Sequence, residues 1–268
     1  MSVSIDKLED NGIPSLSILV VDDDELNQRL MHVLLTREGH RVEKASNGLE
    51  ALEAVKLKKY DIVFMDLHMP VMDGIEASRQ IRAWENGGTH TFIVALTASY
   101  VPENGQILFA AGIDNYISKP LAIEHIQRLV RYSSRALVTS SSSTNFVSSS
   151  ESAQQVLDTQ VGLQQVGGDS EIYRELLTDF VQELPVKIHR LNNFYEAQNM
   201  EEVSRAAHNL RGVAANLGAL QIFYLAKKLE EQSTGSYTPS LRESIQDLRT
   251  AAESLSGYTK EYLNKSDN

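Results

Sequence analysis

Five short apolar runs, each with the length and β-branched content of a strand, alternate with amphipathic stretches between about Ser15 and Arg135. The near-continuous apolar character of two of them, SILVV and DIVFM, indicates strands buried on both faces. Alternation of strand and helix predicts a parallel sheet covered by helices on both sides. The five runs are LSILVV, HRVEKA, YDIVFM, FIVALT and DNYISK, and helical patterns begin near Glu25, Gly48, Gly74, Pro102 and Leu121.

Five such units in about 120 residues are typical of the α/β flavodoxin-like fold, for which we expect a five-stranded sheet in the order 2-1-3-4-5. In that layout ligands bind beyond the carboxyl ends of the strands, at the point where the strand order reverses. The sequence therefore predicts a site at that edge of the sheet.

A serine-dominated stretch, TSSSSTNFVSSSES from Thr139 to Ser152, shows neither a helical nor a strand period and is interpreted as a flexible linker. Every periodic segment after Asp158 is helical, and the short connections between them predict an all-α four-helix bundle. Asp169 or Ser170 is expected to cap the first of these helices, and Pro185 to kink it or to start a new one. The predicted organisation is a tail at 1–14, an α/β domain at 15–135, a linker at 136–156 and the bundle at 157–265.

Composition excludes several classes of function. The 268 residues carry a formal net charge of -11, which repels phosphate backbones, so nucleic acid is not an expected partner. There is no cysteine, which removes disulfides and thiolate chemistry. No apolar run approaches the roughly 18 residues of a membrane-spanning helix, and the N-terminus is too acidic for a signal peptide. We expect a cytoplasmic protein with no membrane insertion in this segment.

Carboxylates stand at the ends of two strands that should be neighbours in the sheet. Asp22 and Asp23 follow the first strand, and Asp66 ends the third. Like charges this close raise each other's pKa unless a cation is present, and hard oxygen ligands suit one Mg²⁺ ion. Thr97 and Lys119 end the fourth and fifth strands, where a hydroxyl and an ammonium are placed to stabilise a phosphoryl group.

Residues from Leu16 to Tyr132 resemble the receiver domain of two-component response regulators, through the acid pair in VVDDDE, the aspartate in FMDLHMPVMDG, and the ALT and ISKP segments. The resemblance implies that Asp66 accepts the phosphoryl group and catalyses its own phosphorylation and dephosphorylation. It implies Mg²⁺ ligation by Asp23, Asp66 and the His68 backbone carbonyl, with Asp22 acting through water. The family's switch hydroxyl corresponds to Thr97, its phosphoryl-binding lysine to Lys119, and its switch aromatic to Tyr116.

A histidine in the second half stands beside an apolar helical stripe. Val203, Ala207, Leu210, Ala214 and Leu217 follow the spacing of a core-facing stripe, and His208 lies one step off it, so we expect its ring to reach solvent. Arg211 and Gly212 share the face of the histidine. A glycine inside a helix costs about 1 kcal/mol relative to alanine, which indicates close approach of another surface. Arg211 is expected to pair with a phosphoryl group carried on that surface.

The segment AHNLRGVAANLGA resembles the signature of histidine phosphotransfer domains, and the helical pattern agrees over about Leu157 to Leu263. The resemblance implies that His208 carries a phosphoryl group on Nε2. The family usually has lysine where this chain has Arg211, which keeps the charge and changes its geometry.

These resemblances predict a phosphorelay protein in which Asp66 receives a phosphoryl group from a histidine kinase and His208 exchanges it with the aspartate of a response regulator. No segment has the glycine spacing of an ATP-binding loop, so the chain is not a kinase by itself, and its donor is another protein or the remainder of the same polypeptide. Transfer between Asp66 and His208 is open to cis and trans routes. One alternative is a phosphorylation-gated binding switch or phosphate sink with little transfer through His208. Another, a hydrolase with Asp66 as nucleophile, lacks the expected Asp-x-Asp spacing.

Overall fold

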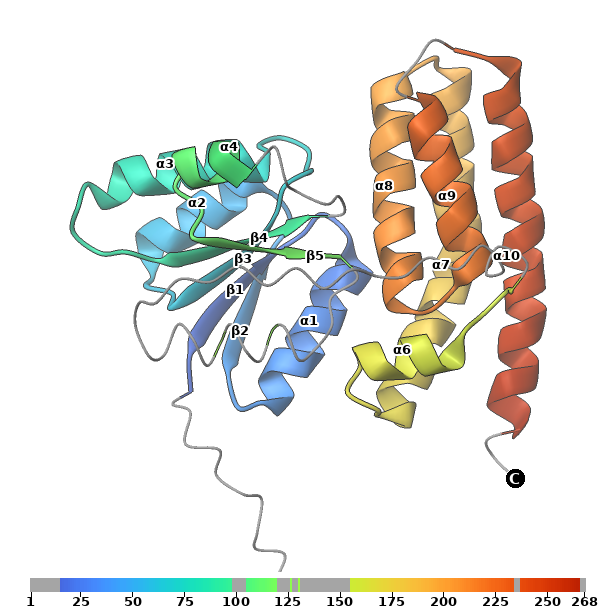
Figure 1. The fold of residues 1–268 in the computed structure, drawn as a ribbon, viewed down its shortest axis with the longest axis horizontal. Coiled ribbons are helices and arrows are strands. Elements are labelled where there is room, and N and C mark those ends of the chain that lie inside the picture. The colour runs from blue at the N-terminus through green and yellow to red at the C-terminus, as the bar shows by residue number, and fades with distance from the viewer. Residues whose placement is uncertain are drawn as a thin grey trace, which may run out of the picture.

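The computed structural model describes residues 15–97, 105–119, 126, 130, 155–233 and 237–265. Within them, a sheet flanked by helices lies beside a bundle of long helices, and helix α1 (Glu25–Arg37) stands between the two (Figure 1). The predicted tail at 1–14 and all but the end of the predicted linker at 136–156 lie outside the described residues.

The sheet has five parallel strands in the order β2-β1-β3-β4-β5, which confirms the predicted flavodoxin-like topology. Every residue of the first and third strands is buried, as their unbroken apolar character predicted. Pairing of Val21 with Met65 places the carboxyl ends of these two strands side by side. The strands are β1 (Ser17–Val21), β2 (Arg41–Ala45), β3 (Ile62–Asp66), β4 (Phe92–Thr97) and β5 (Asn115–Ser118).

Helices cover both faces of the sheet. Helices α2 (Gly48–Leu57), α3 (Gly74–Glu85) and α4 (Gly105–Ala110) lie on one face, and α1 lies on the other (Figure 1). Asp24, Asn47 and Asp73 cap the first three helices by accepting hydrogen bonds from backbone N–H groups of the first turn, which is why each helix begins directly after them. At Gly74, a Cβ atom would lie 2.1 Å from the Asp66 carbonyl oxygen, so only glycine lets α3 begin this close to β3.

Helix α1 has two apolar faces. Met31 and Leu35 pack against the sheet. Leu26, Leu30 and Leu34, one turn apart from each other, belong instead to the hydrophobic core of the bundle. The first helix of the α/β unit therefore completes a core built mainly by the second unit.

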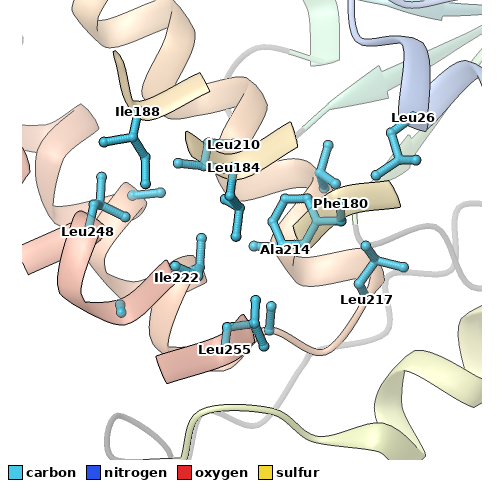
Figure 2. Packing of buried hydrophobic residues seen from close by; sticks show 14 of the residues in the cluster. Leu26, Phe180, Leu184, Ile188, Leu210, Ala214, Leu217, Ile222, Leu248 and Leu255 are labelled. Atoms are coloured by element: carbon cyan, nitrogen blue, oxygen red, sulfur yellow. The ribbon is translucent and has the colours of Figure 1, made fainter. Parts of the chain in front are cut away.

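The second unit contains a short helix, α6 (Thr159–Gln165), and the four long helices predicted for the bundle, α7 (Ser170–Glu196), α8 (Met200–Asn216), α9 (Leu220–Ser233) and α10 (Pro239–Lys265). Leucine, isoleucine and phenylalanine side chains from these helices fill its centre, with Leu26 of α1 at the edge (Figure 2). The predicted apolar stripe of α8 is fully buried. Asp169 caps α7 by accepting a hydrogen bond from Ile172 N, as predicted.

Pro185 starts no new helix, because α7 runs without interruption from Ser170 to Glu196. Leu184 and Ile188, on either side of the proline, are both buried in the bundle core, whereas Pro185 is exposed. The burial of these neighbours on one continuous face holds the helix together across the missing N–H.

Candidate functional site

Three carboxylates meet at the carboxyl edge of the sheet. Asp22 and Asp23 follow β1 and Asp66 ends β3, and one oxygen of each lies within 4.8 Å of the others. Asp22 and Asp66 are each 1% exposed, whereas Asp23 is half-buried. The structure thus brings together the acids that strand order alone placed at this edge.

Lys119 lies among these acids, immediately after β5. Its Nζ donates to Asp66 Oδ2 at 2.7 Å and to Asp22 Oδ2 at 2.8 Å, and its side chain is buried. Burial by itself lowers the pKa of this ammonium, but the two carboxylates reverse that effect and raise it, so Lys119 stays charged. Its backbone N–H donates to the carbonyl oxygen of Thr97 at 2.6 Å, which fixes its place beside the end of β4.

The pKa values of the three acids are shifted in different directions. Burial raises the pKa of Asp22 to about 7, against the attraction of Lys119, and it raises the pKa of Asp23. Burial acts in the same direction on Asp66, but Lys119, the charge of His208 and the backbone N–H of His68 outweigh it and lower the pKa of Asp66. Asp66 is therefore the acid of the cluster that is held as a carboxylate.

The oxygens that stay available favour a hard cation. Asp23 Oδ1 is buried and has no hydrogen-bond partner, whereas Asp23 Oδ2 accepts from Asn209 at 2.9 Å. Asp66 Oδ1 accepts a long hydrogen bond of 3.3 Å from the backbone N–H of His68. An unsatisfied buried carboxylate oxygen beside a second weakly engaged one fits Mg²⁺.

Two further predicted residues line the same edge. Thr97 is 3% exposed at the end of β4 and pairs in register with Ser118, directly before Lys119. Tyr116 is half-buried in β5, and its ring lies 6.4 Å from that of Phe109 in α4.

The prediction that the His208 ring reaches solvent is wrong, because the side chain is buried, with 6% of the residue exposed. The α/β unit covers it: the rings of His68 and His208 lie 4.8 Å apart, centroid to centroid. One ring nitrogen of each histidine and one Asp66 oxygen lie within 4.8 Å of one another. His208 Nε2 is buried without a hydrogen-bond partner.

Glu230 of α9 holds the other nitrogen of the His208 ring. Its Oε1 lies 2.9 Å from Nδ1, and its Oε2 lies 3.0 Å from Nη1 of Arg211. Burial tends to raise the pKa of Glu230, but His208 and Arg211 outweigh it and lower the pKa. Arg211 thus pairs with Glu230, and its expected pairing with a phosphoryl group stays a prediction. Sequence reasoning missed Glu230, since no local pattern links it to a histidine on another helix.

Polar contacts surround the place where α1 meets the bundle. Asp24 Oδ2 accepts from Lys187 Nζ at 2.6 Å, and Asn27 Oδ1 accepts from Asn216 Nδ2 at 3.3 Å. Single surface ion pairs stabilise by about 0–1 kcal/mol, whereas each fully buried leucine contributes roughly 1.5–3 kcal/mol. The stripe of Leu26, Leu30 and Leu34 therefore dominates the docking. Ion pairs flank it and join Arg29 to Glu175 and Asp179, and Arg37 to Asp169.

Comparison with known proteins assigns the two halves of the chain to different domain families. Residues 18–131 match the response regulator receiver domain family, and residues 175–257 match the Hpt domain family. The sensory/regulatory protein RpfC of Xanthomonas campestris pv. campestris (strain 8004) is 31% identical over 216 residues, 78% of this chain and 29% of its own length. The aerobic respiration control sensor protein ArcB of Escherichia coli (strain K12) is 25% identical over 243 residues, 90% of this chain and 31% of its own. The chain spans less than a third of either relative.

Among solved structures, the receiver domain of sensor histidine kinase PA1611 from Pseudomonas aeruginosa PAO1, with magnesium ion coordinated in the active site cleft, is 32% identical. It covers 46% of this chain and 100% of that chain, with a TM-score of 0.42. The co-crystal structure of the Saccharomyces cerevisiae histidine phosphotransfer signaling protein Ypd1 with the receiver domain of Ssk1 matches with 29% identity and a TM-score of 0.43. That match covers 47% of this chain and 94% of the solved chain.

Fold and matches together define a receiver domain followed by a histidine phosphotransfer bundle. Residues 18–131 belong to the receiver domain family and residues 175–257 to the Hpt domain family, so the chain carries the two domain types of a two-component phosphorelay. Within the part of the chain that the structure describes, no helix combines the length and the apolar character needed to cross a membrane.

Proposed function

We propose that Asp66 accepts a phosphoryl group from the phosphohistidine of a histidine kinase and that His208 of the same chain exchanges it with Asp66. The observation that carries this proposal is the position of the His208 ring, with a nitrogen within 4.8 Å of an Asp66 carboxylate oxygen. Since Nδ1 is engaged by Glu230, Nε2 is the nitrogen left to face the receiver. A nucleophile reacts from about 3–3.5 Å, so this separation leaves room for one phosphoryl group between two acceptors.

Asp66 performs the first step. Its Oδ1 attacks phosphorus, the P–N bond of the donor phosphohistidine breaks with its electron pair returning to the imidazole, and an acyl phosphate forms. The low pKa of Asp66 keeps the nucleophile ionised. Lys119 and the Thr97 hydroxyl are placed to stabilise charge on the phosphoryl oxygens during this displacement.

His208 performs the second step. Its Nε2 lone pair attacks phosphorus, the P–O bond breaks and the Asp66 carboxylate is restored. Glu230 accepts the Nδ1–H hydrogen bond, which fixes the tautomer with a free Nε2 and stabilises the positive charge that the ring gains. Reversal of both steps is equally available, and the phosphorylated His208 serves an aspartate on a separate response regulator after the receiver leaves.

Asp23, Asp66 and the His68 carbonyl would hold one Mg²⁺ ion, with Asp22 behind them, in line with the unsatisfied Asp23 oxygen. When bound, the ion supplies positive charge that offsets the acids and the phosphoryl oxygens. The donor is proposed to be a histidine kinase, which draws on ATP in the cytoplasm, and the acceptor a response-regulator receiver domain.

The test follows labelled phosphate from a small phosphodonor, with Mg²⁺ present, in wild type and in Asp66→Ala and His208→Gln variants. Label on His208 is expected only when Asp66 is intact, and its rate of appearance is expected to be independent of protein concentration. A mixture of the two variants is the control for transfer between chains. The proposal fails if the mixture labels His208 as fast as wild type does. It also fails if His208→Gln passes label to an added response-regulator receiver domain as wild type does.

A further inference from the structure

Three side chains of different chemistry meet where the receiver covers the bundle. Asp66, His68 and His208 place one carboxylate oxygen and two imidazole nitrogens within 4.8 Å of one another. Unlike the cluster of Asp22, Asp23 and Asp66, which offers only carboxylate oxygens, this set is rich in nitrogen. Imidazole with one carboxylate suits Zn²⁺ and similar transition ions, whereas Mg²⁺ prefers oxygen alone.

The buried imidazole has an unsatisfied nitrogen. His208 Nε2 has no hydrogen-bond partner although the side chain is more than nine-tenths buried. A buried polar atom without a partner destabilises the folded chain, and a ligand that binds it removes that cost. The nitrogen lies among His68 and Asp66, the two residues able to share a metal with it.

The far side of the same ring carries the support that metal-binding histidines need. Glu230 Oε1 lies 2.9 Å from His208 Nδ1, and Glu230 is itself paired with Arg211. A carboxylate on the second nitrogen fixes the tautomer, orients the ring and increases its basicity toward a metal. Glu230 therefore stands to His208 as the supporting carboxylate of a metal-binding histidine does, with the metal on the opposite ring nitrogen.

We propose that the docked chain binds one Zn²⁺ ion between its two domains, through Asp66 Oδ1, a ring nitrogen of His68 and Nε2 of His208, with water as the fourth ligand. Zn–N bonds of about 2.0–2.1 Å place tetrahedral ligand atoms roughly 3.4 Å apart. The three ligand atoms, which lie within 4.8 Å of one another, therefore move closer together when the ion binds. His68 is an exposed residue whose ring lies 4.8 Å from that of His208, and Lys119 occupies Asp66 Oδ2 rather than Oδ1.

Such an ion joins the receiver to the bundle. It also occupies Asp66 and His208 together, and under the proposed function this stops phosphoryl transfer until the metal is removed. The site forms only when the domains are docked, since Asp66 and His68 come from one unit and His208 from the other. Binding itself does not depend on any phosphoryl chemistry.

The binding test is a calorimetric titration of the full chain with Zn²⁺, with millimolar Mg²⁺ present throughout and no phosphodonor. One equivalent is expected to bind, and Co²⁺ as a substitute is expected to give the visible absorption of a tetrahedral centre. His68→Ala and His208→Gln are each expected to weaken binding at least tenfold, and Glu230→Gln by roughly 10–100-fold.

His90→Ala is the matched control, because His90 is an exposed imidazole beside a carboxylate, with Nε2 2.7 Å from Asp114 Oδ1. It is expected to bind Zn²⁺ as wild type does. Because His68 is exposed, its replacement tests the site without disturbing the core, and circular dichroism verifies the fold of every variant. Absence of stoichiometric binding, or equal binding by His68→Ala and wild type, overturns the proposal.

A second readout follows label transfer to His208 with and without Zn²⁺. Zinc is expected to stop transfer in wild type, whereas His68→Ala is expected to keep most of its own zinc-free rate, and a chelator is expected to restore transfer in wild type. If zinc binds yet transfer continues, the two domains do not share the ion and the bridging site is wrong. If the metal-free wild type itself transfers nothing, the relay proposal fails while the calorimetric result stands.

Discussion

Gly212 of α8 faces Lys119 of the receiver domain: a Cβ atom at Gly212 would lie 3.6 Å from Cδ of Lys119 and 4.0 Å from Nδ2 of Asn27. The glycine expected from sequence to admit another surface does face one. A distance of 3.6 Å is ordinary van der Waals contact, so a single methyl group fits and a longer side chain does not.

Gly212→Ala and Gly212→Leu are therefore expected to differ sharply. Alanine relieves the cost of glycine in a helix and is expected to raise the free energy of unfolding of the bundle by about 1 kcal/mol, with label transfer unchanged. Leucine separates the two acceptors, and a displacement of about 1 Å at a reacting centre costs roughly 100-fold in rate. Urea unfolding and the rate of label transfer to His208 measure the two effects. Wild-type transfer by Gly212→Leu contradicts the docked geometry.

Leu30 tests the apolar docking of α1. It is 3% exposed and belongs to the core of the bundle rather than to that of the receiver. Leu30→Glu buries an unpaired carboxylate at the contact and is expected to separate the domains while both stay folded. His208 then reaches solvent, and its modification by diethyl pyrocarbonate, followed by mass spectrometry, is expected to accelerate.

The control for this experiment is Leu57→Glu, because Leu57 is 89% exposed at the end of α2. It adds the same charge and is expected to leave His208 protected. Equal protection of His208 in Leu30→Glu and Leu57→Glu shows that the leucine stripe does not hold the domains together.

The fold was predictable because its determinants are local. Unbroken apolar runs such as that around Phe64 identify buried strands, and residues such as Asp169 cap helices whose starts follow directly. The acidic edge was predictable for a related reason, since parallel strands bring their carboxyl ends together whatever the loops between them. The strand order alone was enough to predict that Asp22 and Asp66 lie close together.

The docked arrangement was not predictable, because it depends on residues far apart in the chain. Leu26, Leu30 and Leu34 read as an ordinary helical stripe, and no sequence pattern shows that they enter the core of another domain. The exposure expected for His208 assumed an isolated bundle, and the receiver changes it. Glu230 stands 22 residues from His208, and only the packing of α9 against α8 brings their side chains together.

Glu230 is expected to act as a positioning residue for His208. Glu230→Ala removes the hydrogen-bond acceptor of Nδ1, so the ring loses its fixed tautomer, and label transfer to His208 is expected to fall roughly 10–100-fold. Phosphorylation of Asp66 itself is expected to stay at the wild-type level. Glu230→Gln retains an acceptor oxygen and is expected to recover part of the rate. A general loss of stability instead predicts equal losses in both variants and reduced label on Asp66.

The last prediction concerns His40, which couples the stability of the receiver to pH. Its Nδ1 accepts a hydrogen bond from the backbone N–H of Leu16 at 3.3 Å, and burial lowers its pKa in spite of the attraction of nearby Glu38. Below pH 6.5 the imidazole of His40 is protonated to a greater extent in the unfolded chain than in the folded chain, so the free energy of unfolding falls as pH falls. The loss grows as pH falls from 6.5 toward the lowered pKa of His40 in the folded chain.

The measurement is urea unfolding at pH 7.5 and pH 5.5, followed by the fluorescence of Trp84, the single tryptophan, which lies in α3 of the receiver. His40→Asn is the informative variant, because its amide oxygen accepts from Leu16 N–H at either pH and takes up no proton. It is expected to lose less stability than wild type between the two pH values. Parallel pH profiles for His40→Asn and wild type would mean that another group, and not this imidazole, couples the receiver to protons.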